Sequence, residues 1–119
     1  MMMKMYHYPN CSTCKKARRF VDSHGQQLTA LIDIVKNPPT ESEIRDIWKR
    51  SGVPLRRLFN TSGQSYRQGG FKDRLPSMSE QEQISALAAD GKLIRRPLLA
   101  YPQGALVGFK EPEWLEAFG

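Results

Sequence analysis

Two cysteines separated by two residues, Cys11 and Cys14, are the groups in this 119-residue chain whose type and spacing permit chemistry. In thiol–disulfide exchange, one thiolate of such a pair attacks a disulfide and the other resolves the mixed disulfide. The same spacing serves zinc, but zinc needs two more soft ligands and only His7 and His24 remain. The other alternative is two small buried residues without chemistry. We expect redox chemistry and no metal site.

The segments around the cysteines predict a strand followed by a helix. Residues 3–8 form an apolar and aromatic run that stops at Pro9-Asn10, as a buried strand does before a turn. Residues 11–25 carry apolar side chains on one helical face and basic side chains on the other. Residues 28–35 are apolar and β-branched, which predicts a second strand parallel to the first.

The junction between strand and helix distinguishes the two cysteines. Unpaired backbone N–H groups and the helix dipole stabilise a thiolate at a helix N-terminus, and Lys15 and Lys16 add positive charge nearby. Cys11 is therefore the predicted nucleophile. Cys14 lies one turn further into the helix, is expected to be more buried, and is the predicted resolving cysteine.

The rest of the chain predicts a helical stretch and then a hairpin with a last helix. The expected elements are a capped helix from Thr40 to Gly52, short helices between Pro54 and Met78, a capped helix from Ser79 to Asp90, strands over residues 98–101 and 105–109, and a helix from Pro112. The order βαβ then ββα is the thioredoxin-like arrangement. We therefore predict an α/β fold, with residues 1–119 as one domain and a helical insertion at about residues 40–92.

Arg96-Pro97 is the second chemical feature. In a thioredoxin-like fold, a proline at the start of the third strand faces the cysteine pair, usually in the cis form, and Pro97 occupies that position. The preceding side chain then lies near the sulfur, so Arg96 is expected to stabilise the Cys11 thiolate or to bind an oxyanion beside it.

Three segments carry a resemblance to a known family: the run from Tyr8 to Ala17, the segment Pro38-Pro39-Thr40, and the run from Leu93 to Leu98. In this order and spacing they resemble the glutaredoxin-linked arsenate reductase/Spx family over nearly the whole chain. The chain is most similar to the uncharacterised arsenate-reductase-like branch with a C-x-x-C motif. The resemblance implies a thioredoxin-like fold with an inserted helical subdomain, a redox-active first cysteine and a functional arginine before a cis proline.

The arsenate reductases of this family use one cysteine, matching Cys11, and three arginines that hold the oxyanion and form a subsite for glutathione or glutaredoxin. Arg96 matches one arginine, Asn60 stands at the position of the second, and Lys110 near the third could substitute in charge only. Asparagine and lysine do not form the bidentate clamp that arginine forms on an oxyanion. We expect Asn60, Lys15 and Pro97 to border the binding site, and efficient arsenate reduction to be impaired.

The Spx-type regulators of the family share the C-x-x-C pair as a disulfide switch and bind the RNA polymerase α subunit through the helical region. Gly52 is similar in position to a glycine that matters for that contact. A glycine at a helix end is also an ordinary C-cap. This alternative predicts a redox-gated regulator.

Composition restricts the partners and the cellular location that we expect for the chain. The chain has 18 Lys+Arg against 12 Asp+Glu, a net charge of +6, but its basic residues are scattered and no nucleic-acid-binding motif accompanies them. Direct nucleic-acid binding is therefore not expected. No apolar run reaches the ~20 residues of a membrane span, and the N-terminal residues lack the features of a signal peptide. We expect a cytoplasmic protein without a membrane partner.

The sequence thus predicts a thiol–disulfide oxidoreductase-like protein of the arsenate reductase family. Cys11 attacks a substrate or glutathione, Cys14 resolves, and Arg96 assists the thiolate or a bound anion. No bound cofactor is expected, and glutathione or glutaredoxin is the expected reductant. The alternatives are a redox-sensing regulator that binds the RNA polymerase α subunit and a glutathione/glutaredoxin-dependent arsenate reductase.

Overall fold

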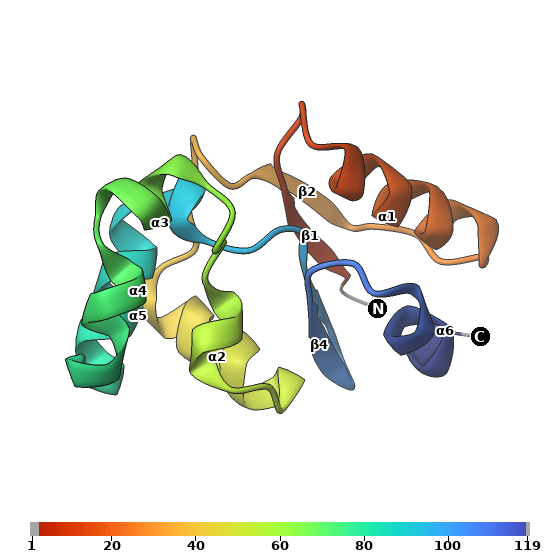
Figure 1. Cartoon of the computed structure of the whole chain (residues 1–119). Coiled ribbons are helices and arrows are strands. Elements are labelled where there is room, and N and C mark those ends of the chain that lie inside the picture. The colour runs from red at the N-terminus through yellow and green to blue at the C-terminus, as the bar shows by residue number, and fades with distance from the viewer. Residues whose placement is uncertain (1–2, 119) are drawn as a thin grey trace.

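A four-stranded mixed β-sheet lies between two groups of helices in the computed structural model, which describes residues 3–118 (Figure 1). The strand order is β2-β1-β3-β4. β1 and β2 are parallel, and β3 is antiparallel to both β1 and β4. The strands are β1 (Lys4–His7), β2 (Ala30–Asp33), β3 (Leu98–Tyr101) and β4 (Gly104–Val107). The predicted βαβ and ββα units of a thioredoxin-like α/β fold are confirmed.

Helix α1 (Ser12–Ser23) connects β1 to β2 and begins immediately after Cys11, which is its N-cap residue. Its buried positions, Cys14, Ala17, Phe20 and Val21, recur at intervals of three and four residues, so one stripe of the helix packs on the sheet. The sequence therefore places the second cysteine on the buried stripe and the first at the exposed end of the helix.

The hairpin of β3 and β4 is followed by α6 (Glu111–Phe118). β4 ends at Val107, two residues before the predicted end, because Gly108 adopts a φ of 71° and leaves the ladder. The Gly108 N–H then donates to the Pro97 carbonyl at 2.8 Å, and its carbonyl accepts from the indole N–H of Trp114 at 3.1 Å. These bonds hold the turn after β4 against Pro97, the residue before β3.

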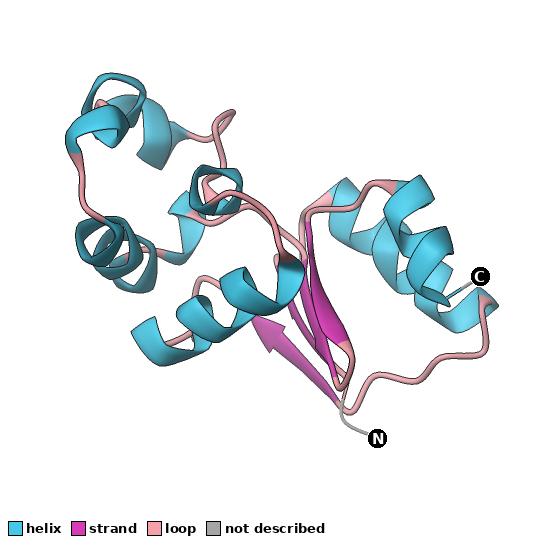
Figure 2. Cartoon of the chain, turned by 90° about the horizontal axis from the view of Figure 1, so that it is seen from below, coloured by secondary structure: helices cyan, strands magenta, loops and turns pink. Residues whose placement is uncertain are grey.

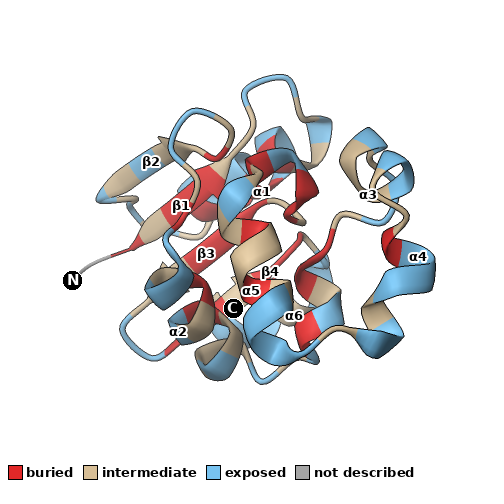
Figure 3. Ribbon diagram, turned by 90° about the vertical axis from the view of Figure 1, so that its left-hand side faces the viewer, coloured by how far each residue is buried: buried red, intermediate tan, exposed pale blue. Residues whose placement is uncertain are grey.

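The sheet separates two hydrophobic cores, since neighbouring residues of a strand point to opposite faces. Met5 and Leu99 pack with α1 and with Trp114 of α6. Tyr6 and Leu98 pack on the other face, against the helices inserted between β2 and β3. Figure 2 shows the two helix groups on opposite sides of the sheet, and Figure 3 shows the buried residues along β1, β3 and β4.

The inserted segment is helical, as predicted. It consists of α2 (Glu41–Ser51), η1 (Leu55–Leu58), α3 (Gln64–Gln68), α4 (Phe71–Arg74), η2 (Leu75–Ser77), α5 (Glu80–Ala89) and η3 (Gly91–Leu93). Thr40 caps α2 and Ser79 caps α5, both in the reciprocal capping-box arrangement that their spacing predicts. Among the helices within residues 3–118, none combines the length and apolarity that a membrane span requires.

The insertion returns to the sheet through a short antiparallel contact. Phe59 forms an isolated bridge with Ile94, the Asn60 N–H donates to the Leu93 carbonyl at 2.8 Å, and the Arg95 N–H donates to the Leu58 carbonyl at 2.7 Å. This pairing lays the end of η1 beside the residues that lead into β3. It brings two stretches that are far apart in the sequence to the same edge of the molecule.

Candidate active site

The two cysteines lie at the start of α1 as free thiols. The Cys14 backbone N–H donates to the Cys11 sulfur at 3.4 Å, so the N-cap residue supplies a sulfur acceptor to the first turn of its own helix. Cys11 is partly exposed, whereas Cys14 is fully buried. The predicted arrangement of an accessible first cysteine and a buried second one is therefore present.

The two thiols have opposite pKa shifts. Partial burial disfavours the Cys11 thiolate, but hydrogen bonds from the Cys14 thiol and N–H, the charge of Arg96 and the Thr13 N–H outweigh it and lower the Cys11 pKa. Burial is the main cause that raises the Cys14 pKa to about 12, and the hydrogen bond to Cys11 and repulsion from its thiolate add to it. The accessible Cys11 thiol therefore ionises more readily than the buried Cys14 thiol.

Arg96 lies beside this pair, and its charge favours the thiolate form of both sulfurs. The guanidinium carbon is 4.9 Å from the centroid of the Tyr8 ring. Its Nε and Nη1 atoms are buried, and within residues 3–118 neither has a hydrogen-bond partner. The next residue, Pro97, is buried, and the Arg96–Pro97 peptide bond is cis, as expected from its position before β3. Arg96 thus keeps donor capacity next to the sulfur.

Cys11 opens into a pocket of about 420 Å³ between the insertion and the turn after β4. Four residues that the sequence singles out line it from different parts of the chain: Cys11, Asn60, Arg96 and Lys110. The full lining is Cys11, Thr13, Arg57, Asn60, Ser62, Gly63, Arg95, Arg96, Val107, Gly108, Phe109 and Lys110. The pocket is suited to an anion, because its charged lining residues are all cations.

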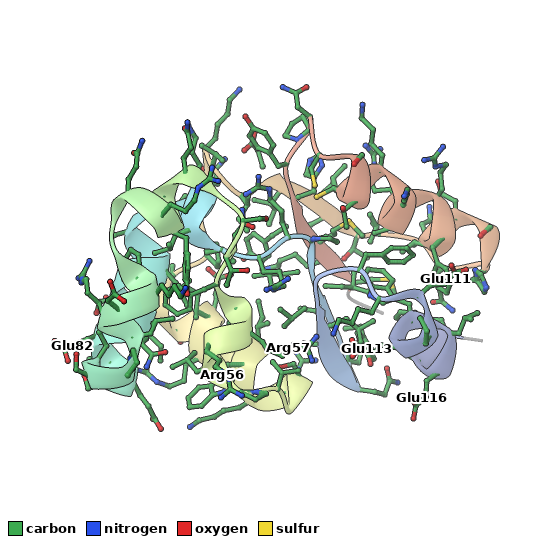
Figure 4. The ribbon with its side chains drawn as sticks, in the orientation of Figure 1. Arg56, Arg57, Glu82, Glu111, Glu113 and Glu116 are labelled. Atoms are coloured by element: carbon green, nitrogen blue, oxygen red, sulfur yellow. The ribbon has the colours of Figure 1, made fainter. Side chains whose placement is uncertain are left out.

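Arg57 and Arg95 are pocket residues that the sequence did not single out. The Arg95 Nε donates to the Arg57 carbonyl at 2.8 Å, and burial together with repulsion from Arg57 lowers the Arg95 pKa. Arg57 in turn approaches Glu113 of α6, with 3.8 Å between Nη1 and Oε2 (Figure 4). In the sequence both arginines belong to scattered basic pairs. Only the backbone pairing of residues 58–60 with 93–95 brings them together.

Lys15 is not brought to this pocket. Its side chain is exposed and lines a shallow hollow on the outer face of α1 with Arg18, Arg19 and Asp22, three, four and seven residues further along the helix. The interval of three to four residues keeps all four on the solvent side of α1. In the described part of the chain, no three His, Cys, Asp or Glu side chains gather as they would around a metal ion.

Comparison with known proteins matches residues 6–117 to the ArsC family. The uncharacterised protein YusI of Bacillus subtilis is 41% identical over 116 residues, which cover 98% of each chain. A solved ArsC-family-related protein from Bacteroides fragilis is 40% identical with a TM-score of 0.92, covering 98% of this chain and 97% of that one. A possible arsenate reductase from Streptococcus mutans is 44% identical with a TM-score of 0.86, covering 97% and 98%.

The more distant relatives include both an enzyme and a transcriptional regulator. An arsenate reductase of Rhizobium meliloti is 28% identical, over 87% of this chain and 72% of its own length. The global transcriptional regulator Spx of Listeria monocytogenes is 23% identical, over 94% of this chain and 83% of its own length. With the thioredoxin-like fold and the cysteine pair in place, these matches show that the chain belongs to the ArsC family.

Proposed function

We propose that this ArsC-family chain is a thiol–disulfide oxidoreductase with Cys11 as its nucleophile. One observation carries the proposal: the accessible sulfur at the start of α1 has a lowered pKa, while the buried sulfur next to it has a raised one. A low-pKa, accessible thiol backed by a neutral one is the arrangement that exchange chemistry needs.

The reaction begins when the Cys11 thiolate attacks one sulfur of a partner disulfide. A bond forms between Cys11 and that sulfur, the partner's S–S bond breaks, and the other sulfur leaves as a thiolate. Cys14 then loses its proton and attacks Cys11, which releases the second partner thiol and leaves a Cys11–Cys14 disulfide. Two electrons pass from the chain to the partner. Two glutathione thiols or a glutaredoxin dithiol would return them.

The pKa of Cys14 depends on whether the first step, the attack by Cys11, has occurred. In the resting pair, repulsion from the Cys11 thiolate and the hydrogen bond to it both raise that pKa. Once Cys11 is in a mixed disulfide it carries no charge, so these two effects disappear and Cys14 ionises more readily. The resolving thiol therefore remains protonated until the first attack has occurred.

Intact-mass spectrometry after exposure to oxidised glutathione tests this function. The wild-type chain should lose two hydrogens as the internal disulfide forms, whereas Cys14→Ser should accumulate one glutathione on Cys11. Cys11→Ser is the matched control and should react far more slowly, because its remaining thiol is buried. A Cys11→Ser variant that reacts as fast as Cys14→Ser would contradict the proposal.

Arsenate reduction is a second candidate, which the cations around Cys11 support. Four cationic side chains line the same pocket as the sulfur: Arg57, Arg95, Arg96 and Lys110. The pocket therefore carries positive charge although Asn60 stands at the position of one arginine. An assay with arsenate, glutathione, glutaredoxin, glutathione reductase and NADPH tests it. Arsenate-dependent NADPH loss that vanishes in Cys11→Ser would support this activity, and absence of such loss in the wild-type chain would exclude it.

A redox-gated regulator is a third candidate, supported by the relatedness to Spx and by the exposed Gly52. Gly52 ends α2 with a φ of 72°, and a Cβ built on it meets nothing within 4 Å, so the surface there is open to a partner. Capture of the RNA polymerase α subunit that differs between the reduced and oxidised chain would support regulation. Equal or absent capture in both redox states would exclude it.

A further inference from the structure

Tyr8 contacts all three groups that the proposed chemistry uses. Its carbonyl accepts the Cys11 N–H at 3.0 Å, and its N–H points to the Cys14 sulfur at 3.5 Å. Its ring lies 4.9 Å from the Arg96 guanidinium carbon. Tyr8 directly follows β1, so the central strand of the sheet fixes its backbone.

The two backbone contacts would persist with other side chains at this position. The contact with Arg96, in contrast, needs an aromatic ring, because the negative face of the ring attracts the cation. The buried Nε and Nη1 of Arg96 have no hydrogen-bond partner within residues 3–118, so no hydrogen bond from these two atoms places the guanidinium. A carboxylate at this place would also hold the guanidinium, but it would cancel the charge that a thiolate or anion needs.

We propose that Tyr8 is a positioning residue whose aromatic ring holds the Arg96 guanidinium beside the Cys11 sulfur while leaving its positive charge uncompensated. The inference rests on the proposed function in that Arg96 serves Cys11. The ring itself takes no part in bond making. It keeps the donors of Arg96 directed at the place where negative charge develops, on the thiolate or on a bound anion.

Alkylation of Cys11 by iodoacetamide, followed by peptide mass mapping across pH, measures the effect on the thiolate. Tyr8→Phe keeps the ring and should titrate as the wild type does. Tyr8→Leu keeps apolar bulk without the ring and should raise the midpoint by about half a pH unit or more, which is about threefold less thiolate at pH 7. In an Arg96→Gln background, Tyr8→Leu should add nothing, because Tyr8 acts through Arg96.

A second readout does not depend on how reactive Cys11 is. Phenylglyoxal modifies accessible guanidinium groups, and a ring that holds Arg96 also shields it. Tyr8→Leu should therefore increase Arg96 modification several-fold, while the exposed Arg18 reacts equally in all variants. Tyr8→Met replaces Tyr8→Leu if the latter fails to fold, as judged by circular dichroism.

The outcomes separate this inference from the function on which it rests. If wild-type Cys11 titrates as an ordinary thiol, the proposed function fails, and the phenylglyoxal comparison still decides the role of Tyr8. If wild-type Cys11 is activated but Tyr8→Leu changes neither its titration nor Arg96 modification, the positioning role is overturned. Independent, additive effects of Tyr8→Leu and Arg96→Gln would overturn it as well.

Discussion

At the scale of single residues, environment gives two identical side chains different chemistry. Cys11 and Cys14 are one helical turn apart, yet one sulfur accepts an N–H at the helix start and the other lies in the core. The difference arises from burial and from the N–H groups at the helix start, whereas Arg96 favours the thiolate form of both sulfurs. The spacing predicts which cysteine attacks, but the contribution of Tyr8 depends on a contact with a distant arginine that no local pattern contains.

A comparison of Arg96 with Lys15 tests this view of the site. Arg96 acts directly on the Cys11 sulfur, whereas Lys15 is exposed on the outer face of α1. Arg96→Gln should lower the rate of Cys11 alkylation at pH 7 about threefold or more, which is half a pKa unit in thiolate. Lys15→Gln should change it by less than about twofold at 0.15 M salt, because water and ions screen an exposed charge. An equal effect of the two substitutions would contradict the pocket as described.

At the scale of elements, paired caps fix where the inserted helices begin. Thr40 accepts the Glu43 N–H at 3.1 Å and Ser79 accepts the Glu82 N–H at 3.1 Å, with each glutamate bonding back to the capping residue. Thr40→Ala and Ser79→Ala should each lower the free energy of unfolding by about 1 kcal/mol. Ser42→Ala, at an exposed position inside α2, is the control and should stay within about 0.5 kcal/mol in urea unfolding.

Gly91 marks a close approach between the insertion and the chain that follows β2. A Cβ on Gly91 would collide with the carbonyl of Ile34, just after β2, and this backbone atom cannot move aside as a side chain could. Gly91→Ala should therefore lower the free energy of unfolding by about 1–3 kcal/mol. Lys92→Ala changes the exposed neighbouring residue and should have little effect. If both variants unfold at the same urea concentration, the predicted contact between Gly91 and the Ile34 carbonyl is wrong.

At the scale of the whole molecule, one carboxylate joins the sheet to the insertion. Glu43 of α2 accepts the Tyr6 hydroxyl at 2.6 Å and the Lys4 ammonium at 3.2 Å, both from β1. Partial burial opposes ionisation of Glu43, but the Thr40 N–H, the Tyr6 hydroxyl and Lys4 outweigh it and lower its pKa to about 2.

The lowered pKa of Glu43 predicts that the free energy of unfolding decreases at acidic pH. The folded-state pKa lies below the unfolded value of about 4.3, so the stabilisation is complete above that value and is lost as the pH falls toward 2. Glu43→Gln removes this titration. The difference in urea midpoint between the wild type and Glu43→Gln should therefore shrink between pH 5 and pH 2. A difference in urea midpoint that is constant with pH would show that these contacts do not lower the pKa of Glu43.

Local patterns predict most of the architecture, because hydrophobic periodicity, caps and glycine stops act within a few residues. They predict the strand order poorly and give no indication that residues 58–60 pair with 93–95, since that contact depends on how the insertion packs. The sequence does not single out Arg57 and Arg95 for this reason, and Lys15, which we expect from the sequence to border the binding site, lines a separate hollow on α1. The position before Pro97 predicts Arg96, the resemblance to the family predicts Asn60, and both residues line the same pocket.

The pH dependence of Cys11 alkylation in the reduced wild-type chain tests the central claim most directly. Iodoacetamide reacts with the thiolate, so the rate follows its ionised fraction, and mass mapping assigns the signal to Cys11. A midpoint clearly below the ~8.5 of a free cysteine, with Cys14 unreactive over the same range, is the predicted result. A Cys11 that titrates at or above ~8.5 would contradict the account.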